Sequence, residues 1–169
     1  LLKQKINPKK ICIIGDGKIN GLLGAHLTFP DAKIYSCNLT EMLINENLIL
    51  NRTELPLKNL IKVVGTIDEI DDDSYKLFLI PSNLKNFLLN KKIDLFINIA
   101  SFQEMTYSEV NNYFRIIKNN KSTLYCCNRE HKKLSDLETH FSKEQLEEEL
   151  YFDKYPWDNC TRIFYEDCP

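Results

Sequence analysis

Three glycines near the start of the chain are spaced so that they could cradle a ligand. Gly15, Gly17 and Gly21 form the pattern Gly-x-Gly-x-x-x-Gly directly after the apolar run at residues 11–14. Without a Cβ, the backbone can turn sharply there and approach a ligand. The helix expected next, at 19–29, would aim its N-terminal N–H groups at that ligand. The spacing differs from the dinucleotide fingerprint Gly-x-Gly-x-x-Gly, so a tight turn without a ligand is the alternative.

Polar residues also follow the other strands that the sequence predicts. We expect strands at 10–15, 32–38, 75–81, 93–100, 122–127 and 161–166, with helices between most of them, including 83–90 and 134–150. Alternating strands and helices predict an α/β fold with a doubly wound, mostly parallel sheet. Ligands of such sheets bind at the carboxyl ends of the strands. That rule gathers one rim of residues, namely 15–17, 38–41, 81–83 and 100–104, with 128–131 nearby.

Composition narrows the classes of function. The 169 residues fit one domain, 1–169, and the net charge of −2 gives no electrostatic reason to expect nucleic acid or an anionic membrane. No apolar run approaches the ~20 residues that cross a bilayer, and residues 1–3 do not resemble a signal peptide. We therefore expect a cytoplasmic protein, with a homo-oligomer left open. The first residue is not Met, which is consistent with a fragment or a processed chain.

The cysteines point to a reduced compartment rather than to a metal or a disulfide framework. Cys12, Cys37, Cys126 and Cys127 lie inside expected strands, where cysteine usually acts as a small buried hydrophobe. No Cys-x-x-Cys motif occurs, so neither zinc nor a redox pair is indicated. The acidic run at 68–73 fits a solvated loop, with a metal site as the alternative. We predict no metal site.

A longer motif is more specific than the glycine turn. Residues 94–105, Asp-Leu-Phe-Ile-Asn-Ile-Ala-Ser-Phe-Gln-Glu-Met, resemble the signature of a family of sugar O-methyltransferases. That family lies within the class I S-adenosylmethionine-dependent methyltransferases, which have a Rossmann-like sheet. Residues 38–41 and 111–114 are similar to the same family, so the resemblance covers about 10–128. It implies S-adenosylmethionine as the cofactor and a saccharide hydroxyl as the substrate, with polysaccharide or glycan biosynthesis as the setting.

The resemblance also assigns roles to individual residues. It implies that the methionine part of the cofactor lies against the glycine turn, the ribose at the end of the second strand and the adenine after the third sheet strand. Further residues would stand beside the transferable methyl. Gly15, Asp16 and Gly17 would contact the methionine part, and Asn38 or Glu41 the ribose. Ser82 and Asn83 would lie near the adenine, and Ser101, Gln103 and Glu104 beside the methyl.

Two positions depart from the pattern of class I methyltransferases. The acid usually found two residues before the first glycine is Ile13 here, and the usual ribose-binding Asp is Asn38. An asparagine keeps an acceptor oxygen but has no charge to strengthen the contact. A sixth and a seventh strand are also expected after the fifth, and only 161–166 is visible. We therefore expect that the sheet is truncated at one or both ends.

Removal of the acceptor proton needs a base. Glu104 is the first candidate because it follows the central strand, and His131 is the second because histidine titrates near neutral pH. The alternative for Glu104 is a helix N-terminal acid, or a capping box with Ser101. The alternative for His131 is an ordinary solvated residue, since charged residues surround it.

Three functions compete at this point. The first is S-adenosylmethionine-dependent O-methylation of a sugar. The second is an NAD- or nucleotide-binding Rossmann protein built on the glycine turn, although no Tyr-x-x-x-Lys pair is present. The third is a degenerate methyltransferase-like domain that binds a partner without catalysis, which the residues at 13 and 38 favour.

Overall fold

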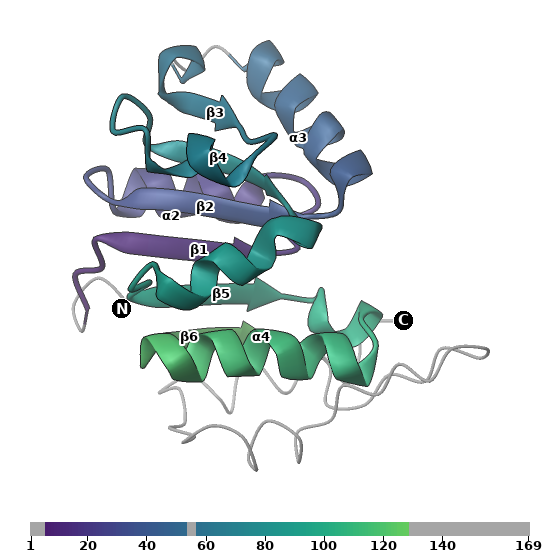
Figure 1. The fold of residues 1–169 in the computed structure, drawn as a ribbon. Helices are drawn as coiled ribbons and strands as arrows, with labels where there is room; N and C mark the ends of the chain where they lie inside the picture. Colours follow the sequence, from purple (N-terminus) through teal and green to yellow (C-terminus); the bar gives the residue numbers. More distant parts are fainter. Residues whose placement is uncertain (1–5, 54–56, 129–169) are drawn as a thin grey trace.

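A computed structural model describes residues 6–53 and 57–128 (Figure 1). The expected strand at 161–166, the expected helix at 134–150 and the second candidate base, His131, lie outside the described residues. Within the described part, no helix is long and apolar enough to cross a membrane.

The described chain forms a six-stranded, fully parallel sheet in the order β3-β4-β2-β1-β5-β6. The doubly wound parallel sheet predicted from the sequence is therefore confirmed. The strands are β1 (Lys10–Ile14), β2 (Lys33–Asn38), β3 (Ile61–Val63), β4 (Leu77–Pro81), β5 (Leu95–Ile99) and β6 (Thr123–Cys127). The α-helices are α2 (Asn20–Thr28), α3 (Thr40–Arg52) and α4 (Tyr107–Asn120). The short 3-10 helices are η1 (Lys58–Leu60), η2 (Ile67–Asp71), η3 (Ser82–Asn90) and η4 (Phe102–Glu104).

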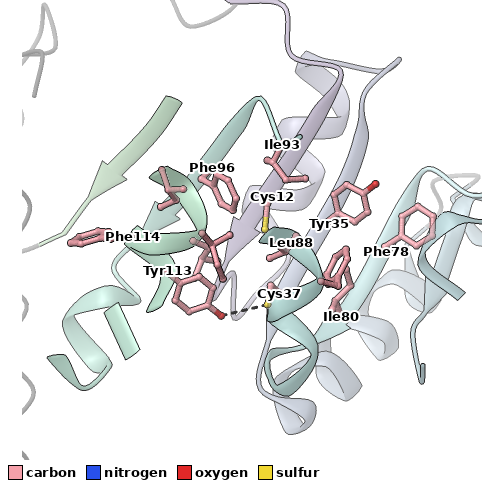
Figure 2. Packing of buried hydrophobic residues seen from close by; sticks show 14 of the residues in the cluster. Cys12, Tyr35, Cys37, Phe78, Ile80, Leu88, Ile93, Phe96, Tyr113 and Phe114 are labelled. Atoms are coloured by element: carbon pink, nitrogen blue, oxygen red, sulfur yellow. Dashed lines mark hydrogen bonds between the residues drawn. The ribbon is translucent and has the colours of Figure 1, made fainter. Parts of the chain in front are cut away.

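Both faces of the sheet carry a buried cluster. Successive side chains of each strand point to opposite sides, so one apolar strand contributes to both clusters. On one face, Ile11 and Ile13 of β1 pack with residues of α2 and α3. On the other face, Cys12 and Ile14 pack with residues of η3 and α4. Figure 2 shows this second cluster, in which Tyr35 stacks on Phe78 with ring centroids 5.4 Å apart. The four consecutive apolar residues at 11–14 of β1 supply both clusters of this two-sided core.

The structure corrects three details. Residues 61–63 form a parallel edge strand that the sequence did not predict. The helix expected at 83–90 is a 3-10 helix that begins at Ser82. The strand at 93–100 is not central, since it lies between β1 and β6, one strand from the edge of the described sheet, and Ile99 is half exposed. The centre belongs to β2 and β1.

Candidate functional site

The glycine turn and the segment after β5 touch one another at the carboxyl edge of the sheet. The Ser101 hydroxyl donates to the carbonyl oxygen of Ile14 over 2.8 Å. Gly15, with φ of +68°, lies so close to Ser101 that a Cβ at Gly15 would overlap the Ser101 side chain. The two segments thus meet, as expected, but the expected open crevice between them is closed at Gly15. The space beside Gly15 is filled by Ser101 of this chain.

A buried asparagine holds this corner together. Asn98 of β5 is fully buried, and its Nδ2 donates to the Ile14 carbonyl over 3.1 Å and to Ser101 Oγ. Its Oδ1 accepts from Phe102 N over 3.2 Å and from Asn128 Nδ2 over 2.8 Å. The sequence reasoning gave Asn98 no role. The available signal was an amide inside an otherwise apolar strand, because a buried amide must find hydrogen-bond partners.

Asp16 occupies the helix end where a ligand was expected. Its carboxylate accepts from Gly21 N over 2.8 Å and from Leu22 N over 2.7 Å, at the start of α2. Burial raises the pKa of Asp16, against the lowering effect of these two amides. The positive end of the α2 dipole is therefore neutralised by the chain itself. The expectation that these N–H groups face a ligand is wrong for Gly21 and Leu22.

Asn38, the expected ribose contact, turns its side chain toward a buried carboxylate. Its Nδ2 donates to Glu46 Oε1 over 2.7 Å, and its Oδ1 accepts from Leu39 N over 2.9 Å. Ser36 Oγ donates to Glu46 Oε2 over 3.0 Å. Glu46 is fully buried, and burial raises its pKa, with the charge of Asp16 adding to the effect. The sequence reasoning missed Glu46, although two polar residues on one face of a buried strand required a partner.

The other predicted cofactor contacts lie along the same edge. Glu41 is exposed in the first turn of α3. The parallel register of β2 and β4 pairs Asn38 with Pro81, which brings Ser82 and the exposed Asn83 beside the end of β2. Gly17, with φ of +61°, has only the Met42 methyl near the place of a Cβ. The residues predicted for the ribose and the adenine are therefore neighbours.

The first candidate base stands at the outer rim. Glu104 is the exposed last residue of η4, and Gln103 Nε2 lies 3.5 Å from Glu104 Oε1. Gln103 is buried, and its backbone N–H donates to Asn128 Oδ1 over 3.4 Å. The Ser101 hydroxyl makes no cap with η4, so a capping box between Ser101 and Glu104 is not formed. The carboxylate of Glu104 is accessible to a substrate from solvent.

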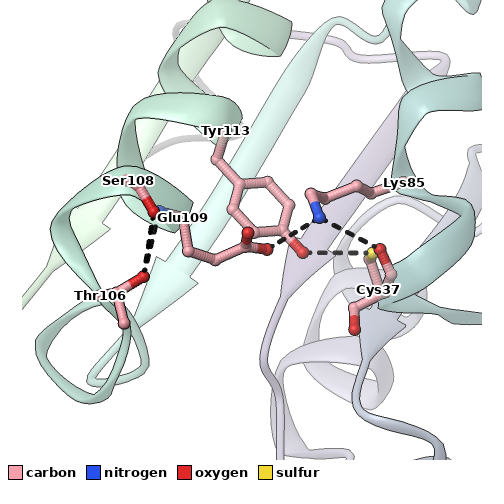
Figure 3. A network of polar contacts seen from close by, with 7 residues as sticks. Cys37, Lys85, Thr106, Ser108, Glu109 and Tyr113 are labelled. Carbon is pink, nitrogen blue, oxygen red and sulfur yellow. Dashed lines mark hydrogen bonds and ion pairs between the residues drawn. The ribbon is translucent and has the colours of Figure 1, made fainter.

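Polar contacts join η3, α4 and the end of β2 (Figure 3). Lys85 Nζ lies 3.0 Å from Glu109 Oε1 and 5.9 Å from the Tyr113 ring centroid. The Tyr113 hydroxyl lies 3.4 Å from Cys37 Sγ. Burial raises the pKa of the Cys37 thiol to about 11, so this cysteine is not a thiolate nucleophile near neutral pH. Among residues 6–53 and 57–128, no group of three His, Cys, Asp or Glu could hold a metal.

Comparisons with known proteins identify the fold. No protein-family model and no curated protein matches the sequence. The methyltransferase domain of bacterial CtHen1 is similar in structure, with a TM-score of 0.52 and 15% identity, over 98% of this chain and 80% of that one. A structure of PigF with SAH gives a TM-score of 0.41 and 9% identity, over 73% of this chain and 31% of that one. The chain thus has the Rossmann-like fold of a class I methyltransferase domain.

Proposed function

We propose that this chain is an S-adenosylmethionine-dependent O-methyltransferase domain that acts on a saccharide hydroxyl. One observation carries the proposal: the glycine turn after β1 and the Ser-Phe-Gln-Glu segment after β5 touch at the carboxyl edge of a methyltransferase-like sheet. A ligand that lies across this edge would contact both segments. The fold shared with the CtHen1 methyltransferase domain supports methyl transfer. The sugar acceptor follows from the resemblance of residues 94–105 to sugar O-methyltransferases.

The residues along the edge suit the nucleoside half of this cofactor. Asn38 and the exposed Glu41 would bind the ribose hydroxyls, and Ser82 and Asn83, which lie beside the end of β2, would contact the adenine. At the other half, Asp16 already satisfies two N–H groups of α2, which leaves Gly17 and its neighbours for the methionine part. When bound, S-adenosylmethionine supplies an electrophilic methyl group on a sulfonium.

The chain would contribute alignment and proton removal. Alignment of the attacking oxygen with the methyl–sulfur bond accounts for several kcal/mol in such displacements. Glu104, exposed on η4, would accept the hydroxyl proton as the oxygen attacks, an effect of about 10²–10⁴-fold. Ser101 and Asn98, which donate hydrogen bonds to the carbonyl oxygen at the end of β1, would hold η4 and the Glu104 carboxylate in place.

A second candidate is a methyltransferase-like domain that binds a partner and catalyses nothing. Asp16, Asn38 and Ser101 all direct hydrogen bonds into the protein, which favours this alternative. Titration calorimetry of the full chain with S-adenosylmethionine, S-adenosylhomocysteine and NAD separates the candidates. We expect the first two ligands to bind. Binding of NAD alone would favour a dinucleotide-binding protein, and heat from none of them would favour the partner-binding domain.

The acceptor is tested by methyl transfer to a panel of mono- and oligosaccharides, followed by mass spectrometry. Glu104→Gln should lower turnover by at least about 10²-fold while cofactor binding is retained. Asp73→Asn is the matched control, because this exposed carboxylate pairs with Lys33 at the amino end of β2, away from the carboxyl ends of the strands. Equal turnover of the wild type and Glu104→Gln would remove Glu104 from the role of base.

A further inference from the structure

A buried carboxylate under the end of β2 has no part in the proposed chemistry so far. Glu46 of α3 is fully buried, and its two oxygens accept from Ser36 Oγ over 3.0 Å and from Asn38 Nδ2 over 2.7 Å. Both donors are neutral. Removing a carboxylate from water is costly, and two neutral donors offset only part of that cost. The position of Glu46 directly behind Asn38 suggests what it does.

Asn38 is 7% exposed, and its amide has one N–H and one lone pair that form no hydrogen bond among the described residues. A side-chain amide has two N–H donors and two acceptor lone pairs. One donor is used by Glu46, and one lone pair is used by the Leu39 N–H. An ionised carboxylate only accepts hydrogen bonds, so the reversed amide would place two oxygens against each other. Glu46 therefore fixes the orientation of the Asn38 amide.

The remaining donor and acceptor match a vicinal diol, in which one hydroxyl accepts a hydrogen bond and the other donates one. We propose that Glu46 is a positioning residue for a ribose diol, because it orients the Asn38 amide that recognises the two hydroxyls. This inference rests on the proposed function, since it assigns the nucleoside end of the same site. Asn38 lies at the carboxyl end of β2, in register with Pro81 and so beside Ser82.

The same contact explains why asparagine, and not aspartate, stands at position 38. An aspartate there would place a second carboxylate about as close to Glu46 as the amide now is, at 2.7 Å. Two carboxylates at that distance cannot both be ionised near neutral pH.

The test compares S-adenosylhomocysteine with its 2′,3′-dideoxy analogue by titration calorimetry on the full chain. The wild type should prefer the diol by about tenfold or more, the value of at least one hydrogen bond. Glu46→Gln can both donate and accept, so it no longer fixes the amide, and the preference should fall about fivefold. The Asn38→Asp variant should lose the preference for the diol, and its melting temperature should be lower than that of the wild type because two carboxylates then face one another.

The double variant Asn38→Asp/Glu46→Gln provides the sharpest result. The introduced glutamine amide would donate to the introduced carboxylate, and the preference for the diol should return to the wild-type value or exceed it. Asn45→Asp is the matched control, because it adds a charge on the exposed side of α3 beside Glu46 and should change nothing.

Two outcomes are distinguishable. If the wild type binds S-adenosylhomocysteine and Glu46→Gln keeps its preference for the diol unchanged, the positioning role is overturned and the proposed function stands. If the wild type binds neither ligand, the proposed function is overturned and the inference falls with it. Glu46→Gln is isosteric, so it remains informative even where Asn38→Asp fails to fold.

Discussion

Replacement of Gly15 by alanine tests the contact between the glycine turn and the segment after β5. Gly15 has φ of +68°, and a Cβ there would overlap both Oγ and Cβ of Ser101. Ser101 cannot easily move away, because its hydroxyl donates to the Ile14 carbonyl and accepts from Asn98. The substitution should therefore destabilise the fold even in the absence of any ligand.

The expected magnitude is the sum of two effects. A left-handed backbone costs a residue with a Cβ about 1–2 kcal/mol. Overpacking against a fixed neighbour costs about 1–3 kcal/mol more. Gly15→Ala should thus lower the free energy of unfolding by about 2–5 kcal/mol, a large part of the ~5–15 kcal/mol that holds a domain of this size folded.

Two other glycines serve as matched controls. Gly17 has φ of +61°, but the nearest atom to its added Cβ is the Met42 methyl at 3.7 Å, an ordinary contact. Gly17→Ala should therefore cost only the backbone effect, about 1–2 kcal/mol. Gly24 lies inside α2 with nothing within 4 Å of the added Cβ, so Gly24→Ala should stabilise by about 0.5–1 kcal/mol.

The assay is urea denaturation followed by circular dichroism, in which a change of midpoint at constant slope reports stability. We expect the order Gly24→Ala, wild type, Gly17→Ala and Gly15→Ala, from most to least stable. The double variant Gly15→Ala/Ser101→Gly should recover the overpacking part, with a coupling of about 1–3 kcal/mol. Equal destabilisation at Gly15 and Gly17, with no coupling to Ser101, would refute the packing argument.

Three further predictions concern buried or half-buried charges. Asp16→Asn should lower the free energy of unfolding by about 1–2 kcal/mol in urea denaturation. Each of the two α2 N–H groups donates to a different oxygen of Asp16, and asparagine replaces one of these oxygens by an NH2 group that cannot accept. The pKa of Glu46 is raised in the folded state, so the folded protein binds the proton more tightly, and the free energy of unfolding should fall as the pH rises from 4.5, the ordinary pKa of glutamate. This dependence of the free energy of unfolding on pH should be weaker in Glu46→Gln. Equal pH dependence of the wild type and the variant in denaturation experiments would contradict the prediction. Glu109→Gln leaves Lys85, whose side chain is 17% exposed, without its carboxylate and should cost about 1–2 kcal/mol, whereas Asp73→Asn at an exposed pair should cost less than about 0.5 kcal/mol in the same assay.

The sequence alone determined the layers of this protein. The unbroken apolar run of β1 could only be buried on both faces, and its alternation with helical patterns required a parallel sheet. The carboxyl-edge rule then placed the ends of β1, β2, β4 and β5 together, as the register of the strands confirms. These features follow from periodicity and connectivity, which are local properties of a chain.

Only the tertiary structure decided which polar groups pair at that edge. Ser101 and the Ile14 carbonyl are 87 residues apart in the sequence, and no local pattern predicts their bond. The fit of Gly15 against Ser101, the capture of the α2 end by Asp16 and the orientation of Asn38 by Glu46 each depend on a partner brought near by folding. A buried polar group must find a partner, but its sequence position does not say which, because the choice is made by the packing of elements distant along the chain.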